Sequence, residues 1–160
     1  MNLRKLTSGD EAAMLELLTN SVIKQTYMLP DYASKEDAIP LFHRLLALSQ
    51  DDTQFVRSIC AGGELVGFLN NVEIENGTIE LGYVIHPSHW GKGYATAALK
   101  AAISQLLEAG YETVLAGAFA ENPASIRVME KAGMTRLEKT DEIEYRGKTH
   151  HCVYYAIEKG

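Results

Sequence analysis

The sequence predicts a mixed α/β fold, organised as one domain over residues 1–160. Stretches rich in β-branched and aromatic residues alternate with segments whose apolar residues recur at helical spacing. Dipeptides that favour tight hairpins separate several of the strand-like stretches. With 160 residues and 46% hydrophobic content, the chain can bury one substantial core but is short for two domains. We therefore expect a mixed sheet of about seven strands, with about four helices on its faces.

The N-terminal residues predict a strand and then a helix. Residues 2–6 have the composition of a short strand. Ser8 and Glu11 have the spacing of a capping box, ahead of apolar residues at helical intervals over 14–22. A helix is therefore expected to follow the first strand.

A second helix is predicted over 38–45, after a stretch at 26–32 that has no clear period and ends in turn-forming residues. Pro40 lies inside this helical pattern. Because proline lacks a backbone N–H, we expect it to kink or restart the helix.

Three strands in a meander follow. Residues 53–61 and 64–72 are rich in strand-forming side chains and flank the glycine pair 62–63, which supplies the positive φ angles of a tight hairpin. The Asn-Gly dipeptide at 76–77 is a second hairpin signal, and it leads into a strand over 78–85.

The second half of the chain predicts a crossover and a closing hairpin. Apolar residues at helical spacing over 99–106 end near Gly110 and precede a strand at 113–118. The Asn-Pro dipeptide at 122–123 predicts a helix N-terminus, with the helix running to residue 131 before a glycine. Two last strands flank the Arg-Gly dipeptide at 146–147.

Charge and cysteine content exclude several function classes. The chain has 15 lysine and arginine residues against 21 aspartate and glutamate residues, so its net charge of −6 gives no basic field for nucleic acid or an anionic membrane. No apolar run approaches the roughly 20 residues that span a bilayer. Cys60 and Cys152 lie in strand-like stretches without metal or redox spacing. We expect a cytoplasmic protein with no nucleic-acid or membrane partner.

The most informative stretch is WGKGYAT at 90–96, between a predicted strand and a predicted helix. Its glycines allow successive backbone N–H groups to converge, and the helix N-terminus adds the positive end of a dipole, which suits a pyrophosphate. It matches neither the P-loop nor the dinucleotide-binding pattern. By its spacing alone, the stretch fits a phosphate site and a purely structural turn about equally well.

The segments IELGYVIHPSHWGKGYATAAL and ENPASIRVMEKAGM resemble the acetyl-CoA signature of the GNAT superfamily of N-acetyltransferases, and within it the RimJ/RimL-like group. The superfamily loop has Gln or Arg at its first position, where this chain has Trp90, as is common in the RimJ/RimL-like group. The specific motifs lie between Glu80 and Gly133. The resemblance implies the GNAT fold, whose mostly antiparallel sheet splays between the fourth strand (78–85) and the fifth (113–118).

The resemblance also implies how acetyl-CoA binds. The backbone of the fourth strand would hydrogen-bond the pantetheine arm like an added strand, and the glycine loop would hold the pyrophosphate. An asparagine at the next helix would contact the pantetheine arm, and a serine in its first turn would lie near the thioester sulfur. The residues implied for acetyl-CoA binding are Tyr83, Val84, Ile85, Gly91, Lys92, Gly93, Tyr94, Ala95, Thr96, Asn122 and Ser125.

Glu80 and Ser125 are the candidate catalytic residues. Glu80 shares a strand face with Gly82 and Val84, so a ligand could approach its carboxylate beside a residue that has no side chain. Partial burial would raise the pKa of Glu80 and suit it to accept a proton from the acceptor ammonium. Its alternative role is that of a solvated or salt-bridged strand carboxylate. Ser125 would hydrogen-bond the departing thiolate or simply support its helix N-terminus, as Asn122 would by capping.

Other polar and aromatic residues have structural interpretations. In the run His150-His151-Cys152, neighbouring strand residues face opposite sides and do not readily converge on one ion, so we expect no metal site. Several large side chains fit either an acceptor pocket or ordinary packing, and packing is the more common role. These are Tyr27, Met28, Tyr32, His43 and Trp90.

The sequence thus predicts an acetyl-CoA-dependent N-acetyltransferase that moves an acetyl group onto a primary amine by direct attack in a ternary complex. Acetyl-CoA would be the co-substrate, and no metal is required. The alternative is a non-catalytic module that binds or senses acyl-CoA. The acceptor remains open between a protein N-terminus, a lysine, a polyamine, an amino acid and an aminoglycoside, as does the choice between monomer and homodimer.

Overall fold

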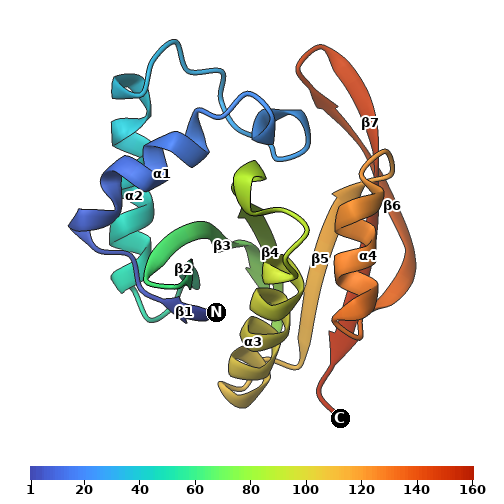
Figure 1. Cartoon of the computed structure of the whole chain (residues 1–160). Helices are drawn as coiled ribbons and strands as arrows, with labels where there is room; N and C mark the ends of the chain where they lie inside the picture. The colour runs from blue at the N-terminus through green and yellow to red at the C-terminus, as the bar shows by residue number, and fades with distance from the viewer. The chain divides into compact units, whose positions relative to one another are not determined.

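A computed structural model of the chain describes residues 1–160 and confirms the mixed α/β fold, with seven strands in one sheet and four α-helices. The strand order is β1-β2-β3-β4-β5-β7-β6 (Figure 1). None of the helices has the length and apolar character that crossing a membrane would require. The elements are β1 (Asn2–Arg4), α1 (Glu11–Leu18), α2 (Ile39–Gln50), β2 (Val56–Ala61), β3 (Glu64–Glu75), β4 (Thr78–Ile85), α3 (Tyr94–Glu108), β5 (Thr113–Phe119), α4 (Pro123–Lys131), β6 (Thr135–Tyr145) and β7 (Lys148–Glu158).

The chain divides into two compact units. The first unit comprises Met1–Asn70 and Tyr83–Ala98, and the second comprises Asn71–Gly82 and Leu99–Gly160. The elements β3, β4 and α3 each contribute residues to both units. That the chain acts as one domain stays a prediction.

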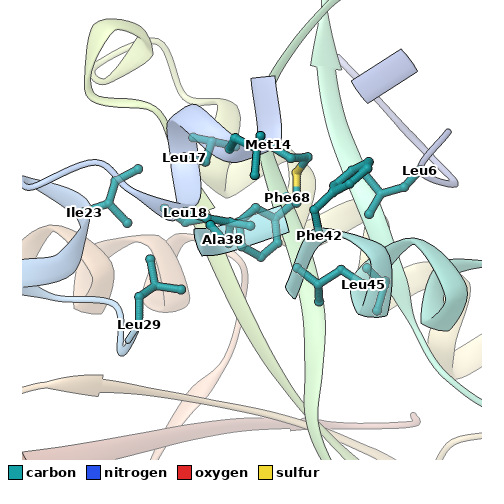
Figure 2. Packing of buried hydrophobic residues seen from close by; sticks show 13 residues of the cluster. Leu6, Met14, Leu17, Leu18, Ile23, Leu29, Ala38, Phe42, Leu45 and Phe68 are labelled. Carbon is teal, nitrogen blue, oxygen red and sulfur yellow. The ribbon is translucent and has the colours of Figure 1, made fainter. Parts of the chain in front are cut away.

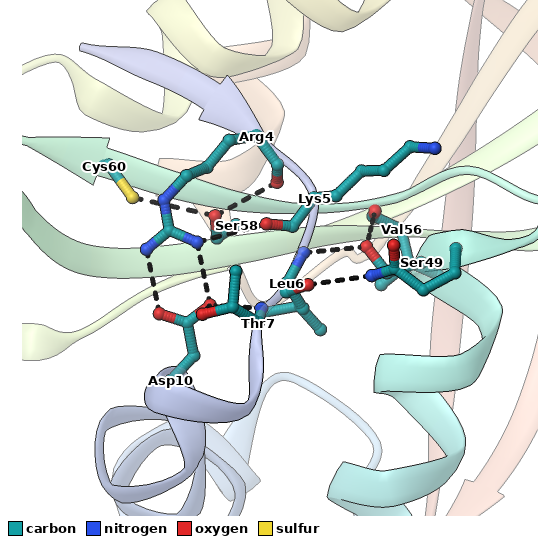
Figure 3. Close-up of polar contacts among 10 residues, drawn as sticks. Arg4, Lys5, Leu6, Thr7, Asp10, Ser49, Val56, Ser58 and Cys60 are labelled. Atoms are coloured by element: carbon teal, nitrogen blue, oxygen red, sulfur yellow. Dashed lines mark hydrogen bonds and ion pairs between the residues drawn. The ribbon is translucent and has the colours of Figure 1, made fainter.

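The predicted first capping box is wrong by one residue, because the carboxylate that caps this turn is that of Asp10. It accepts a hydrogen bond from the backbone N–H of Thr7 at 2.8 Å and forms a bidentate pair with Arg4, both bonds at 2.8 Å (Figure 3). A 3-10 turn at Ser8–Asp10 therefore precedes α1, which begins at Glu11. Helix α1 also ends earlier than predicted, at Leu18, and leaves Val22 exposed.

The core of the first unit lies between α1, α2 and the strands beside them (Figures 1 and 2). Pro40 occupies the first turn of α2, after a 3-10 turn at Glu36–Ala38, so it restarts the helix as predicted. The buried hydroxyl of Ser49 accepts from Leu6 N–H at 2.9 Å and donates to the Val56 carbonyl at 2.7 Å, which fastens α2 to the strand region (Figure 3). Side chains of this core are Met14, Leu17, Leu18, Ala38, Phe42, Leu45 and Phe68.

Strands β2 and β3 pair antiparallel, as predicted. The glycines of their turn have φ angles of 59° and 80°, in the left-handed region that glycine favours. Strand β2 begins at Val56 and not at Thr53, because Thr53 donates its N–H and hydroxyl to the Asp51 carboxylate at 2.9 and 2.7 Å and so belongs to a turn. Strand β3 runs on to Glu75, beyond the predicted end at Val72.

In the second unit, β4 and β5 pair in parallel and α4 lies beside β5 (Figure 1). The parallel ladder ends at Leu81 and Ala116, although β4 continues to Ile85 and β5 to Phe119. The predicted separation of the two strands beyond this ladder stays a prediction. Strand β7 pairs antiparallel with both β5 and β6, so the crossover and closing hairpin are as predicted.

Candidate functional site

The glycine loop of the first unit has the backbone that a phosphate site needs. Gly91 and Gly93 both have φ angles of 78°, in the left-handed region. A Cβ built on either glycine meets no heavy atom within 4 Å, so backbone conformation and not crowding demands glycine here. The loop is exposed. The arrangement presents the loop's backbone to solvent at the start of α3.

Helix α3 begins directly after this loop. Its first intrahelical hydrogen bond runs from Ala97 N–H to the Gly93 carbonyl, at 3.0 Å. The first N–H groups of an α-helix have no acceptor within the helix, so those of Tyr94, Ala95 and Thr96 precede the hydrogen-bond ladder. Donors of this kind, at the positive end of the helix dipole, suit the anionic oxygens of a pyrophosphate.

Trp90 fastens the loop to the end of β4. Its indole Nε1–H donates to the Ile85 carbonyl at 2.8 Å, while 55% of the residue stays exposed. The backbone N–H of Trp90 donates to the Pro87 carbonyl at 3.2 Å, within the 3-10 turn that leads into the loop. Sequence analysis left Trp90 between packing and an acceptor pocket. The structure gives it a positioning role, through the carbonyl of a residue five positions earlier in the chain.

The end of β4 lies against β3 within the first unit. His86 N–H donates to the Val66 carbonyl at 2.8 Å. A Cβ built on Gly67 would overlap the Val84 carbonyl and approach Ile85 Cδ1 to 2.9 Å, so only glycine fits at this point. Sequence analysis missed Gly67, although a glycine inside a strand pattern is a signal of close backbone approach.

Glu80 lies in the second unit, on the β4 segment that pairs with β5. Its side chain is half-buried. Burial raises the pKa of Glu80 above its usual value, the charges of Glu73 and Asp141 raise that pKa further, and Lys139 opposes the shift. The direction is the one predicted for a general base, while the catalytic role of Glu80 stays a prediction.

A group of side chains on β5, β6 and β7 interacts electrostatically with Glu80. The Tyr154 hydroxyl donates to Asp141 Oδ2 at 2.8 Å, and Lys139 Nζ lies 4.7 Å from the centre of the Tyr154 ring. The ring also crowds Gly117, whose built Cβ would lie 2.8 Å from Tyr154 Cε1. Burial raises the pKa of both the Tyr154 hydroxyl and the Cys152 thiol, so both stay neutral near neutral pH. Sequence analysis missed this group, because its members come from three separate strands.

Asn122 caps α4, as predicted. Its side-chain oxygen accepts from the backbone N–H of Ser125 at 3.3 Å. Ser125 lies half-buried in the first turn of the helix. The cap fixes the position of both residues, and their predicted contacts with the pantetheine arm and the thioester sulfur stay predictions.

His150 and His151 have different partners. The buried His150 pairs through Nδ1 with Glu121, stacks on the Phe119 ring at 4.3 Å between centroids, and places Nε2 3.2 Å from the Tyr145 carbonyl. His151 Nδ1 lies 2.6 Å from Glu142 Oε1. Strand alternation separates the two imidazoles, as the sequence predicted. His150 therefore ties β7 to the residue that precedes Asn122.

Comparison with known proteins identifies the family. The family model described as an acetyltransferase (GNAT) domain matches residues 1–135. The chain belongs to the GNAT acetyltransferases. The resemblance found in the sequence is thereby confirmed, and so is the prediction of an acyltransferase enzyme.

Individual GNAT relatives match over nearly the whole chain. The uncharacterised N-acetyltransferase YoaA of Bacillus subtilis (strain 168) is 29% identical over 98% of this chain and 92% of its own. The structure of RimL, a ribosomal alpha-N-protein acetyltransferase in complex with coenzyme A, superposes with a TM-score of 0.87 at 22% identity, covering 98% and 92% of the two chains. Spermidine N-acetyltransferase from Vibrio cholerae, in complex with CoA and spermine, has a TM-score of 0.83 at 21% identity, covering 99% and 95%. At these identities both structures establish the GNAT fold alone.

Proposed function

We propose that this GNAT acetyltransferase uses acetyl-CoA as its acetyl donor and a primary amine as its acceptor. The loop from Gly91 to Thr96 carries this proposal, because two left-handed glycines open directly into a helix N-terminus at the position where a pyrophosphate would bind. Lys92, exposed in this loop, adds a positive charge for the phosphates. That both solved structures described above hold coenzyme A supports the choice of donor.

The backbone of Tyr83, Val84 and Ile85 is proposed to bind the pantetheine arm as an added strand would. The side chains of Val84 and Ile85 are buried, so this segment is fixed by packing while its main chain supplies the donors and acceptors. Asn122 is proposed to contact the same arm from the N-terminus of α4.

The proposed reaction is a direct transfer. The neutral amine nitrogen attacks the thioester carbonyl carbon, the new N–C bond forms, and the C–S bond breaks as the sulfur leaves as a thiolate. Glu80 accepts the proton that the acceptor ammonium loses, directly or through a water molecule. Ser125 donates a hydrogen bond to the thiolate, which takes up the proton that the attacking nitrogen loses as it becomes an amide, and leaves as free CoA. No metal and no acyl-enzyme take part in this scheme.

We further propose that the two units act as one domain in a cytoplasmic protein. Three elements contribute residues to both units, which supports the first point. Cys60 and Cys152 are both free thiols, which fits a reducing compartment and supports the second.

The decisive experiment follows thiol release from acetyl-CoA with a panel of primary amines, and compares it with a reaction that lacks the amine. Amine-dependent release is expected, together with an N-acetylated product detected by mass spectrometry. Tight acetyl-CoA binding without transfer to any amine would favour the alternative, a module that senses acyl-CoA.

A further inference from the structure

A cavity of about 490 Å³ lies within the first unit, lined by the segment that links α1 to α2, by α2 and by β3. Its volume is within the range of small-molecule sites. Most of its lining is apolar or aromatic, and Figure 2 shows Leu18, Leu29, Leu45 and Phe68 of this lining beside the core. The cavity can therefore hold the body of a small hydrophobic ligand.

Tyr27, Phe68 and Asn70 form a hydrogen-bonded and uncharged part of the cavity wall. The Tyr27 hydroxyl donates a short hydrogen bond to Asn70 Oδ1, and the Tyr27 ring stands edge-on to Phe68 with 5.7 Å between centroids and 77° between planes. Burial raises the pKa of Tyr27, which keeps its hydroxyl protonated. A preorganised aromatic wall of this kind lowers the entropy cost of binding an apolar group.

The only charge on the cavity lining is positive. Arg44 on α2 is the single charged residue among the lining residues, and it has no carboxylate partner. No aspartate or glutamate lines the cavity. Asp31, which follows the lining residue Pro30, pairs with Lys24 at 3.2 Å. Coulombic attraction therefore favours an anionic group on the ligand and disfavours a ligand with several ammonium groups.

The cavity also adjoins the strand proposed to hold acetyl-CoA. Phe68 and Asn70 line the cavity from β3. Next to them on the same strand, Gly67 lies against Val84 and Ile85 of β4, and the Val66 carbonyl accepts from His86 N–H. Within the first unit, the cavity and the proposed pantetheine strand are thus on neighbouring strands.

We propose that this cavity is the acceptor site and that its ligand is a small hydrophobic amino acid. Arg44 pairs with the carboxylate, the wall formed by Tyr27 and Phe68 receives the side chain, and the amine is left to be acetylated. The proposal rests on the proposed function, and it names the acceptor class that the sequence left open. It also separates this chain from polyamine acetyltransferases, since two or more ammonium groups would face Arg44 without a carboxylate to receive them.

The test compares phenylalanine, leucine and methionine with phenethylamine, which lacks the carboxylate, and with spermidine, at saturating acetyl-CoA. We expect kcat/KM for the best amino acid to exceed that for phenethylamine by at least about tenfold, which corresponds to about 1.4 kcal/mol. Arg44→Gln should remove this preference by raising KM for the amino acid, and leave phenethylamine almost unchanged. Lys100→Gln, which removes a positive charge from an exposed position of α3 outside the lining, is the matched control.

A higher kcat/KM for spermidine or for a peptide N-terminus than for every amino acid would overturn the proposal. The proposal would also be overturned if Arg44→Gln lowered kcat/KM equally for all acceptors. Titration calorimetry of the amino acids in the presence of CoA separates this proposal from the proposed function. Binding that weakens about tenfold in Arg44→Gln, without any turnover, would sustain the cavity as an amino-acid site and refute acetyl transfer. Turnover of another amine by a protein that binds none of the amino acids would support acetyl transfer and refute the amino-acid site.

Discussion

The close approach of β3 and β4 at Gly67 allows us to predict how Gly67→Ala changes the stability of the protein. In Gly67→Ala, the new methyl group would lie 2.9 Å from Ile85 Cδ1, 3.1 Å from Ile85 Cα and still closer to the Val84 carbonyl oxygen. Carbon atoms in ordinary contact are about 3.5–4.0 Å apart, and the Val84 oxygen would overlap the new methyl group, so the two strands must separate by about 1 Å or more. The Val84 oxygen belongs to the backbone and cannot rotate away.

Overpacking costs about 1–3 kcal/mol, and replacing a glycine restricts the unfolded chain and returns about 0.4–1 kcal/mol. Because the clash is with backbone, the cost lies at the upper end of its range, and we expect Gly67→Ala to lower the free energy of unfolding by about 2 kcal/mol or more, measured by urea denaturation at unchanged m-value. Because the displaced strand is the proposed pantetheine strand, acetyl-CoA affinity measured by calorimetry should fall as well.

Gly9→Ala is the matched control. A Cβ at Gly9 has its nearest neighbour, Thr7 Oγ1, at an ordinary 3.7 Å, and the residue does not have a positive φ. Its free energy of unfolding should change by less than about 0.5 kcal/mol. If Gly67→Ala were as stable as this control and bound acetyl-CoA equally well, the inferred contact between β3 and β4 would be wrong.

Four further predictions address the proposed site. Gly93→Glu should abolish acetyl-CoA binding in calorimetry while the protein stays folded, because the substitution strains a left-handed backbone and brings a carboxylate to the phosphates; unchanged binding would refute the pyrophosphate assignment. Glu80→Gln should lower kcat/KM by roughly two to four orders of magnitude near neutral pH, with partial recovery in alkaline solution. Burial raises the pKa of Glu80. As the pH is lowered, wild-type kcat/KM should therefore begin to fall at a higher pH than it would with an ordinary glutamate as the base. A wild-type pH profile in Glu80→Gln would exclude Glu80 as the base. Ser125→Ala should lose roughly tenfold in kcat/KM without recovery at high pH. Turnover should survive EDTA, and a loss that zinc restores would contradict the metal-free scheme.

Elements that are specified by local residues were predicted well. The helix from Pro123 to Lys131 needs only its Asn-Pro start and its glycine end, and the structure has the predicted boundaries. The hairpin turns at Asn76-Gly77 and Arg146-Gly147 likewise carry their positive φ angles in two adjacent residues. Short-range signals of this kind are complete within a few positions of the chain.

Features that depend on side-chain contacts outside the local pattern were predicted poorly. The start of α1 is set by Arg4, which pairs with Asp10, and Ser8 has the capping pattern without that partner. The role of Trp90 depends on a carbonyl at the end of β4. The environment of Glu80 is completed by β6 and β7, more than fifty residues further along the chain. Sequence periodicity does not predict such contacts, and only the structure shows them.

The hydrogen bond from Trp90 to Ile85 also gives the protein a built-in optical reporter. Trp90 is the only tryptophan in the chain, so the indole emission of the whole protein originates at the glycine loop. Its ring is half in solvent and is bonded through Nε1 to the strand proposed to hold the pantetheine arm. A ligand that settles on the loop changes the solvation of this one ring, and the emission wavelength follows occupancy without any added dye. Stopped-flow fluorescence on the unmodified protein can thus time the arrival of the acetyl donor separately from the chemistry that follows.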